Sequence, residues 1–207
     1  MNILTDKLPE EYKGYKINTD FRVGIKLSDI LDRIKNDSSD DNIDDAIDLL
    51  WGNGVPTTID ENGFIVVDYD LIWETITWFR LGGNPTFEIR KAKRRPKKPD
   101  SELTEDIPYD FEEDSGFIYA AFMQQYGIDL TEVDMHWFKF LALFKALEGT
   151  VFNRLQEIRT QDLTEVAQGK PRAAAARAKQ EMRITKVSPE REKELRLVYG
   201  DEWEDHI

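Results

Sequence analysis

The pattern of hydrophobic positions predicts a mainly helical protein. Between about Asp20 and Ile34, and again from Ile43 to Trp51, apolar residues recur every three or four positions, as on the buried face of an amphipathic helix. The same spacing returns from Asp70 to Leu81. We therefore predict three helices in this part of the chain, the second of which ends at Gly52.

A short β-hairpin is predicted between the second and third of these helices. Thr57 to Ile59 and Phe64 to Val67 are rich in β-branched and aromatic residues, and the segment from Asp60 to Gly63 has the composition of a turn. Tyr15 to Ile17 is a further candidate, either for a strand or for an extended arm.

The densest apolar region runs from Tyr109 to Leu147 and predicts two helices joined by a short turn. Gly127 is placed to end the first helix with a left-handed C-cap, and Thr131 is placed to begin the second as its N-cap. Phe138 should point away from the apolar stripe of the second helix, where it could contact a partner. The residues of this stripe, which we expect to anchor the core, are Val133, Trp137, Phe140, Leu141, Phe144 and Leu147.

Further helices are predicted toward the C-terminus. Thr150 is suited to cap one of them, residues 162–169 predict a break, and Pro171 is suited to the first turn of an alanine-rich helix. Ser188 could begin a last short helix. The alanine-rich helix has little to bury, so it is either a solvated terminal helix or a surface that becomes ordered on a partner.

The predicted fold is therefore mainly α: a helical bundle with a small β-hairpin in the N-terminal half and a helical C-terminal extension. We expect one helical globular domain over residues 1–160, with a charged linker at about 90–108 inside it, and the extension over residues 161–207.

Composition and charge narrow the class of protein. With 40% hydrophobic and 33% charged residues among 207, the chain is typical of soluble globular proteins. Its formal net charge of −13 disfavours general attraction to nucleic acid or to an anionic membrane. The absence of cysteine, of a signal-peptide pattern and of a long apolar run leads us to expect a cytoplasmic protein.

One basic run stands out against this acidic background. Arg90 to Lys98 could bind nucleic acid or an acidic partner, or could be a solvated loop whose charge is answered by the acidic segment that follows it. No aromatic residue is interleaved in the run for base stacking, which favours the loop. The residues that we consider as candidate partner contacts are Phe138, Trp51, Trp73, Arg94 and Arg95.

Candidate catalytic chemistry is sparse. The chain has two histidines, His136 and His206, and no cysteine, which argues against a multi-histidine or cysteine-ligated metal site. His136 is better interpreted as a packing or helix-surface residue than as a general base. The serines lie in no nucleophile-elbow pattern, and no phosphate-binding loop is present. We therefore predict a non-enzymatic protein without catalytic, cofactor-binding or metal-binding residues.

Two segments, DFEEDSGFIYAAFMQQYGIDL and HWFKFLALFKAL, resemble the signature of the bacteriophage gene-product-fifteen family, which is found in the tail modules of long-tailed phages and prophages of Gram-positive bacteria. The resemblance extends from about Asp6 to Arg159. The positions that carry it are Asp110, Asp114, Tyr119, Ala120, Ala121, Phe122, Gln124, Gln125, Tyr126, Gly127, Ile128, His136, Trp137, Phe140 and Leu143.

The resemblance implies a tail assembly chaperone, encoded just upstream of the tape-measure protein and working in the host bacterial cytoplasm. Its implied partner is the tape-measure protein or another tail assembly protein, and a homo-oligomer is a further expectation. The motif residues have packing rather than catalytic character; those of the motif core are Tyr119, Phe122, Tyr126, Gly127, Trp137, Phe140 and Phe144. The alternative function is an acidic phage-encoded adaptor or inhibitor that binds a host protein.

Overall fold

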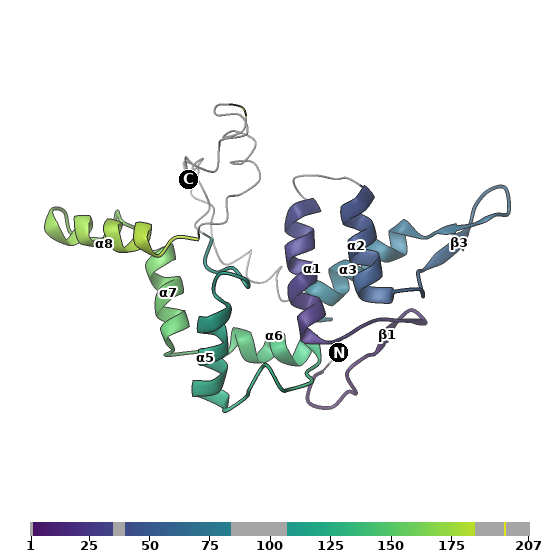
Figure 1. Ribbon diagram of the computed structural model, residues 1–207, viewed down its shortest axis with the longest axis horizontal. Coiled ribbons are helices and arrows are strands. Elements are labelled where there is room, and N and C mark those ends of the chain that lie inside the picture. Colours follow the sequence, from purple (N-terminus) through teal and green to yellow (C-terminus); the bar gives the residue numbers. More distant parts are fainter. Residues whose placement is uncertain (1, 35–39, 84–106, 185–196, 198–207) are drawn as a thin grey trace. The chain divides into compact units, whose positions relative to one another are not determined.

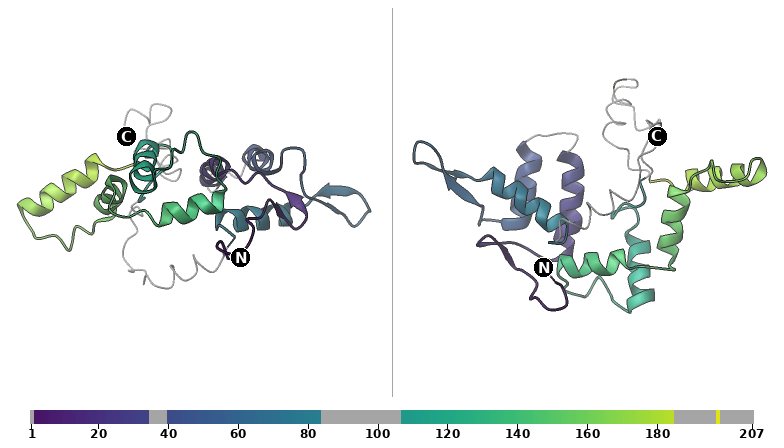
Figure 2. Two further views of the ribbon diagram at one scale, coloured as in Figure 1. Left: turned by 90° about the horizontal axis from the view of Figure 1, so that it is seen from below. Right: turned by 180° about the vertical axis from the view of Figure 1, so that it is seen from behind.

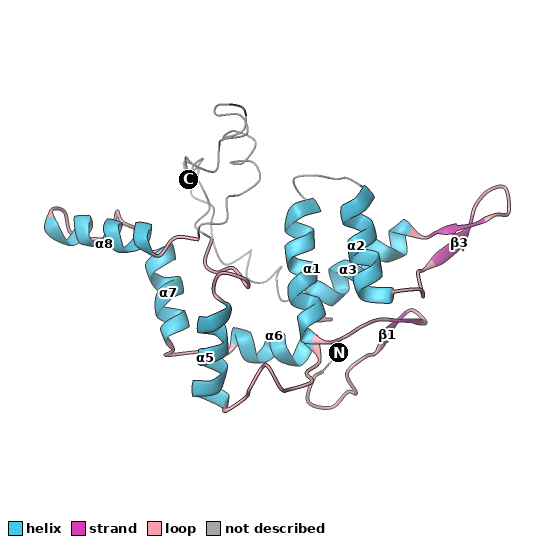
Figure 3. Ribbon diagram, viewed as in Figure 1, coloured by secondary structure: helices cyan, strands magenta, loops and turns pink. Residues whose placement is uncertain are grey.

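The computed structural model describes residues 2–34, 40–83, 107–184 and 197 (Figure 1). Within these ranges the chain forms seven helices and two small antiparallel sheets of two strands each, which confirms the mainly α prediction (Figure 3). The chain divides into two compact units, one of residues 1–97 and 134–145 and the other of residues 98–133 and 146–207. The expected domain over residues 1–160 with a terminal extension stays a prediction.

Four helices make up the body of the first unit. They are α1 (Phe21–Ile34), α2 (Asp40–Trp51), α3 (Tyr69–Arg80) and α6 (Trp137–Lys145). Helix α1 packs against the other three, because its apolar residues line a buried face. The first three helices lie where the hydrophobic spacing predicts them.

Two β-hairpins accompany these helices. Strand β1 (Glu11–Tyr12) pairs with β2 (Tyr15–Lys16), and β3 (Thr57–Ile59) pairs with β4 (Ile65–Val67). The second hairpin confirms the strand prediction. The first is closed by Lys13 and Gly14, both with positive φ, which is the backbone conformation of a tight type I′ turn.

Helix α6 begins later than predicted, and Thr131 is not its N-cap. The helix begins at Trp137 because the residues just before it are extended and pair with the start of α1. The N–H of Phe21 donates to the carbonyl of Met135 at 2.9 Å, and the N–H of Trp137 donates to the carbonyl of Thr19 at 2.7 Å. Thr131 instead donates to the side chain of Asp129 within a turn.

Trp137 occupies the centre of the first unit. Its indole is buried, stacks on Phe79 and Phe140, and donates its N–H to the carbonyl of Phe79 at 3.0 Å. Gly24 makes room for the ring, since a Cβ atom at that position would lie 2.1 Å from the indole Cδ2 atom. This close approach explains a glycine in the interior of α1, where it would otherwise weaken the helix.

The second unit contains α5 (Ser115–Tyr126), α7 (Val151–Thr160) and α8 (Lys170–Glu181), and α7 packs against the other two. Gly127 ends α5 in the left-handed conformation, as predicted. Thr150 caps α7 through a reciprocal pair of hydrogen bonds with Asn153, which confirms the predicted cap.

A buried ion pair ties these three helices together. Asp114, just before α5, accepts two hydrogen bonds from the Arg159 guanidinium, at 2.6 and 2.9 Å, and its side chain is 1% exposed. Arg159 also donates to the carbonyl of Met182 at the end of α8. The Asp114 carboxylate can lie inside the unit because the guanidinium supplies both the opposite charge and two hydrogen bonds.

Some predicted features lie outside the described residues. These are the basic run from Arg90 to Lys98, most of the charged linker, and the last helix from Ser188. Within the described ranges, no helix combines the length and the apolar character needed to cross a membrane.

Candidate partner-binding surface

Among the described residues of the first unit, leaving aside the N-terminal ones, the β3–β4 hairpin carries the most exposed apolar side chains. Ile59, Phe64 and Ile65 are 70%, 68% and 77% exposed, and Val66 and Val67 are also exposed. In each of the three views the hairpin projects away from α2 and α3 (Figures 1 and 2). A protein sheet normally buries at least one face, so an uncovered apolar hairpin is a candidate interaction site.

The strand register shows that both faces of the hairpin are apolar. Ile59 lies opposite Ile65, and Thr57 lies opposite Val67, on one face; Thr58 lies opposite Val66 on the other. Successive residues of a strand point to opposite faces, so the run Ile65, Val66, Val67 supplies apolar side chains to both. The described residues cover neither face.

The apolar surface continues onto the start of α3. Asp68 links the two elements: it follows β4 directly, and its side chain caps α3 by accepting from the N–H of Leu71 at 2.9 Å. Tyr69 and Trp73 are exposed in the first turns of the helix, Trp73 to 36%. Trp73 is thus accessible, as a partner contact must be, and its contact with a partner stays a prediction.

The stretch of chain that forms this surface is rich in carboxylates. Residues 52–79 contain five acidic residues and no lysine or arginine; the acids are Asp60, Glu61, Asp68, Asp70 and Glu74. Lys13, from the β1–β2 turn, pairs with Glu74 at 2.6 Å, and this hydrogen bond lowers the pKa of the Glu74 carboxyl. The surface is therefore apolar with an acidic rim.

Two of the predicted partner contacts belong to the core instead. Phe138 is 3% exposed and Trp51 is 8% exposed, so the expectation that they face a partner is wrong. The ring of Phe138 packs edge-on against Trp78 at 5.1 Å and lies 5.9 Å from the ring of Phe79. Trp78 and Phe79 both belong to α3, so α6 buries the Phe138 side against α3 in addition to its apolar stripe. Arg94 and Arg95 lie outside the described residues.

The motif residues of the sequence resemblance are divided between the two units. Trp137, Phe140 and Phe144 are buried in the first unit and Phe122 in the second. Tyr119 and Tyr126 are half-buried on α5, and Gly127 is the C-cap of that helix. None of them contributes to the exposed hairpin.

His136 fixes the start of α6 through both of its ring nitrogens. The N–H of Phe138 approaches Nδ1 at 3.1 Å and can only donate, so Nδ1 accepts. The carbonyl of Pro9 lies 2.9 Å from Nε2 and can only accept, so Nε2 carries the proton. A single neutral tautomer satisfies both contacts, and in it His136 acts as the N-cap of α6.

This geometry predicts that acidification destabilises the first unit. Burial lowers the pKa of His136 below its ordinary value of 6.5, and the Pro9 carbonyl and Glu10 carboxylate oppose that shift less strongly. With this lowered pKa, the unfolded chain binds a proton at His136 more readily than the folded chain does. The free energy of unfolding therefore has its full value, as far as His136 is concerned, above pH 6.5, and it falls as the pH drops through the lower pKa of the folded protein. Protonation of Nδ1 would also remove the cap.

The measurement is the thermal midpoint of the natural chain and of a His136→Asn variant between about pH 8 and about pH 5.5. Asparagine caps helices without titrating in this range, so the natural chain should lose more stability on acidification than the variant. Parallel profiles would show that His136 does not carry the effect.

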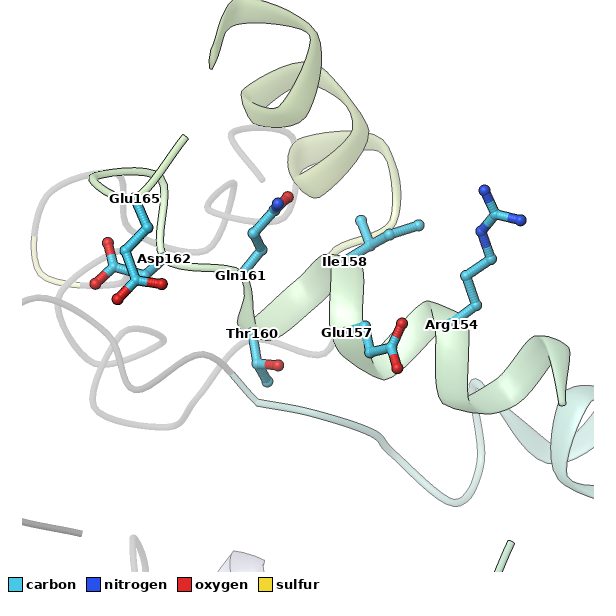
Figure 4. A pocket seen from close by; sticks show the side chains of 7 residues that line it. All are labelled: Arg154, Glu157, Ile158, Thr160, Gln161, Asp162 and Glu165. Atoms are coloured by element: carbon cyan, nitrogen blue, oxygen red, sulfur yellow. The ribbon is translucent and has the colours of Figure 1, made fainter. Parts of the chain in front are cut away.

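A shallow depression at the end of α7 offers no comparable chemistry. Its lining side chains spread along the helix end and the following loop rather than converging (Figure 4). They are Arg154, Glu157, Ile158, Thr160, Gln161, Asp162 and Glu165. Among the residues that the structure describes, no three histidine, aspartate or glutamate side chains come together in a group that could hold a metal ion.

Comparison with known proteins identifies a family. A family model described as "Bacteriophage Gp15 protein" matches residues 4–184, which is most of the chain. No curated protein and no solved structure matches it.

Proposed function

The chain belongs to the bacteriophage Gp15 protein family, and on this basis we propose that it is a non-enzymatic tail assembly protein that chaperones the tape-measure protein. Its partner would be the tape-measure protein, or another tail assembly protein, before the tail tube forms around it. The place of action is the cytoplasm of the host bacterium, and the finished tail does not contain the protein.

The observation that carries the proposal is the uncovered β3–β4 hairpin. A chaperone of an apolar client needs an apolar surface that is exposed until the client arrives. The hairpin provides one in Ile59, Phe64 and Ile65, while the core of the same unit is filled by α1, α2, α3 and α6. The net charge of −13 would keep such a complex in solution.

A phage that carries a nonsense codon in this gene tests the proposal. We expect non-suppressing host cells to make heads without tails, and complementation by the natural gene to restore tails. Purified wild-type particles should lack the protein although the lysate contains it, as shown by immunoblotting. Normal tails in the mutant would overturn the proposal, as would a stoichiometric amount of the protein in particles.

The acidic rim also supports a second function, that of an adaptor or inhibitor that binds a basic host protein. The same mutant phage separates the two. An inhibitor of the host leaves tail formation intact and changes host physiology early in infection, whereas a tail chaperone has the opposite pattern.

A further inference from the structure

The two outer edges of the β3–β4 hairpin are not equivalent. Two hydrogen bonds show which residue pairs of the hairpin are bonded to each other. The N–H of Asp60 donates to the carbonyl of Phe64, and the N–H of Asp68 donates to the carbonyl of Pro56, both at 2.9 Å. Bonded and non-bonded pairs alternate in an antiparallel ladder. The Thr58–Val66 pair is therefore bonded, and the backbone groups of the pairs on either side of it point outward.

The outer edge of β3 is partly closed. The hydroxyl of Tyr15, from the first hairpin, lies 3.4 Å from the N–H of Thr57 and 3.3 Å from its carbonyl. The outer edge of β4 presents the N–H and carbonyl groups of Ile65 and Val67, and no described residue bonds to them. An open strand edge of this kind is a template for another strand.

The side chains beside the open edge define what could pair with it. Ile59, Ile65 and Val67 share one face, so an added strand that alternates in character could place apolar side chains next to them. The charged residues of the stretch from Gly52 to Phe79 are all acidic, and one of them, Glu74, pairs with Lys13. Basic side chains on the added strand would meet that rim, whereas acidic ones would be repelled.

We propose that the outer edge of β4 binds an extended segment of a partner protein that alternates apolar and basic residues, adding it to the hairpin as a third strand. A second copy of this chain fits less well, because edge-to-edge pairing of two hairpins brings two sets of five carboxylates together. The inference rests on the proposed function in one respect, namely that the hairpin is a partner-binding surface. A client segment held in this way is extended, so it cannot form its own helices while bound.

The test uses the full chain and a short fluorescein-labelled peptide of alternating valine and lysine, with fluorescence anisotropy as the readout. The matched peptide replaces every lysine by glutamate. Two variants separate the edges: Ile65→Pro removes an outward N–H from β4, and Ile59→Pro removes the equivalent N–H from β3. Neither N–H is used within the hairpin, and both side chains are exposed, so the core should be unaffected.

We expect the lysine peptide to bind and the glutamate peptide not to bind. Ile65→Pro should weaken binding by about tenfold or more, Ile59→Pro should leave it nearly unchanged, and added salt should weaken it for the natural chain. Equal binding by both proline variants, or loss with Ile59→Pro alone, would overturn the assignment of the edge.

Two other occupants would each overturn the proposal with a distinct result. If a second copy covers the edge, the natural chain will be dimeric in sedimentation and Ile65→Pro monomeric. If the chain's own Arg90 to Lys98 run covers it, the peptide will bind only after that run is replaced by glycine and serine. No phage protein enters this test, so its failure leaves the tail-assembly proposal standing, and failure of the phage test leaves strand addition standing.

Discussion

Replacing Trp137 by alanine is expected to unfold the first unit, because it removes about 3–5 kcal/mol from a domain of ordinary stability. The indole is buried against Phe79 and Phe140, and its N–H satisfies the Phe79 carbonyl. Alanine would leave a cavity where the indole packs and would remove its hydrogen bond, while the Phe79 carbonyl would keep the bond from the N–H of Gly82. Chemical denaturation followed by tryptophan fluorescence and circular dichroism measures the loss.

The packing of Trp137 on α1 can be tested at Gly24, with Gly116 as the matched control. Gly24→Ala would place a Cβ atom 2.1 Å from the Trp137 ring, so the ring or helix α1 must move and stability should fall. Gly116→Ala adds the same methyl group in the first turn of α5, where no atom lies within 4 Å, and should leave stability unchanged or raise it slightly. Equal effects of the two alanines would contradict the packing of Trp137 on α1.

Replacing Arg159 by alanine is expected to destabilise the second unit by about 3–5 kcal/mol. The substitution leaves the Asp114 carboxylate, whose side chain is 1% exposed, without its bidentate partner. It also removes the donor to the Met182 carbonyl, so α8 loses a tie to α7. We expect a lower thermal midpoint and faster proteolysis between α7 and α8.

Arg154→Ala serves as the control, since Arg154 is an exposed residue of the same helix. The double variant Asp114→Leu with Arg159→Met should be less destabilised than Arg159→Ala, because it leaves no unpaired charge in the interior. If Arg159→Ala were as stable as Arg154→Ala, the ion pair would not hold the second unit together.

Local pattern was enough to predict most of the helices. Helices α1, α2 and α3 follow from spacing of apolar residues, and Gly127 and Thr150 mark helix ends by their own backbone and side-chain chemistry. In these segments the residues that predict a helix or its end are the same residues that form it.

The features that the sequence did not predict depend on contacts between segments that are distant in the chain. Thr131 is a good N-cap by local rules. Residues 135–137, however, pair with residues 19–21 near α1, so the helix begins at Trp137. Phe138 lies off the apolar stripe of α6, yet α3 covers it. Asp114 and Arg159 are 45 positions apart, and nothing in either neighbourhood indicates the other.

The candidate surface was predicted as a hairpin, but the apolar strands themselves were not predicted as a site. The sequence indicates the hairpin, and of the candidate contacts that the structure describes, Trp73 lies on the surface whereas Phe138 and Trp51 are buried. The run Ile65, Val66, Val67 has no polar alternation, which is usual for a strand buried on both sides. Its five acidic neighbours, from Asp60 to Glu74, are the feature that could have indicated an exposed hairpin.

The most direct test of this account is co-expression of the chain with the tape-measure protein of its own phage, using the natural chain, Ile65→Pro and Ile59→Pro. We expect the tape-measure protein to be soluble and to co-purify with the natural chain and with Ile59→Pro, and to aggregate with Ile65→Pro. Tape-measure protein whose solubility is the same with and without this chain would contradict the chaperone proposal. Equal rescue by all three forms would contradict the assignment of the β4 edge as the binding surface.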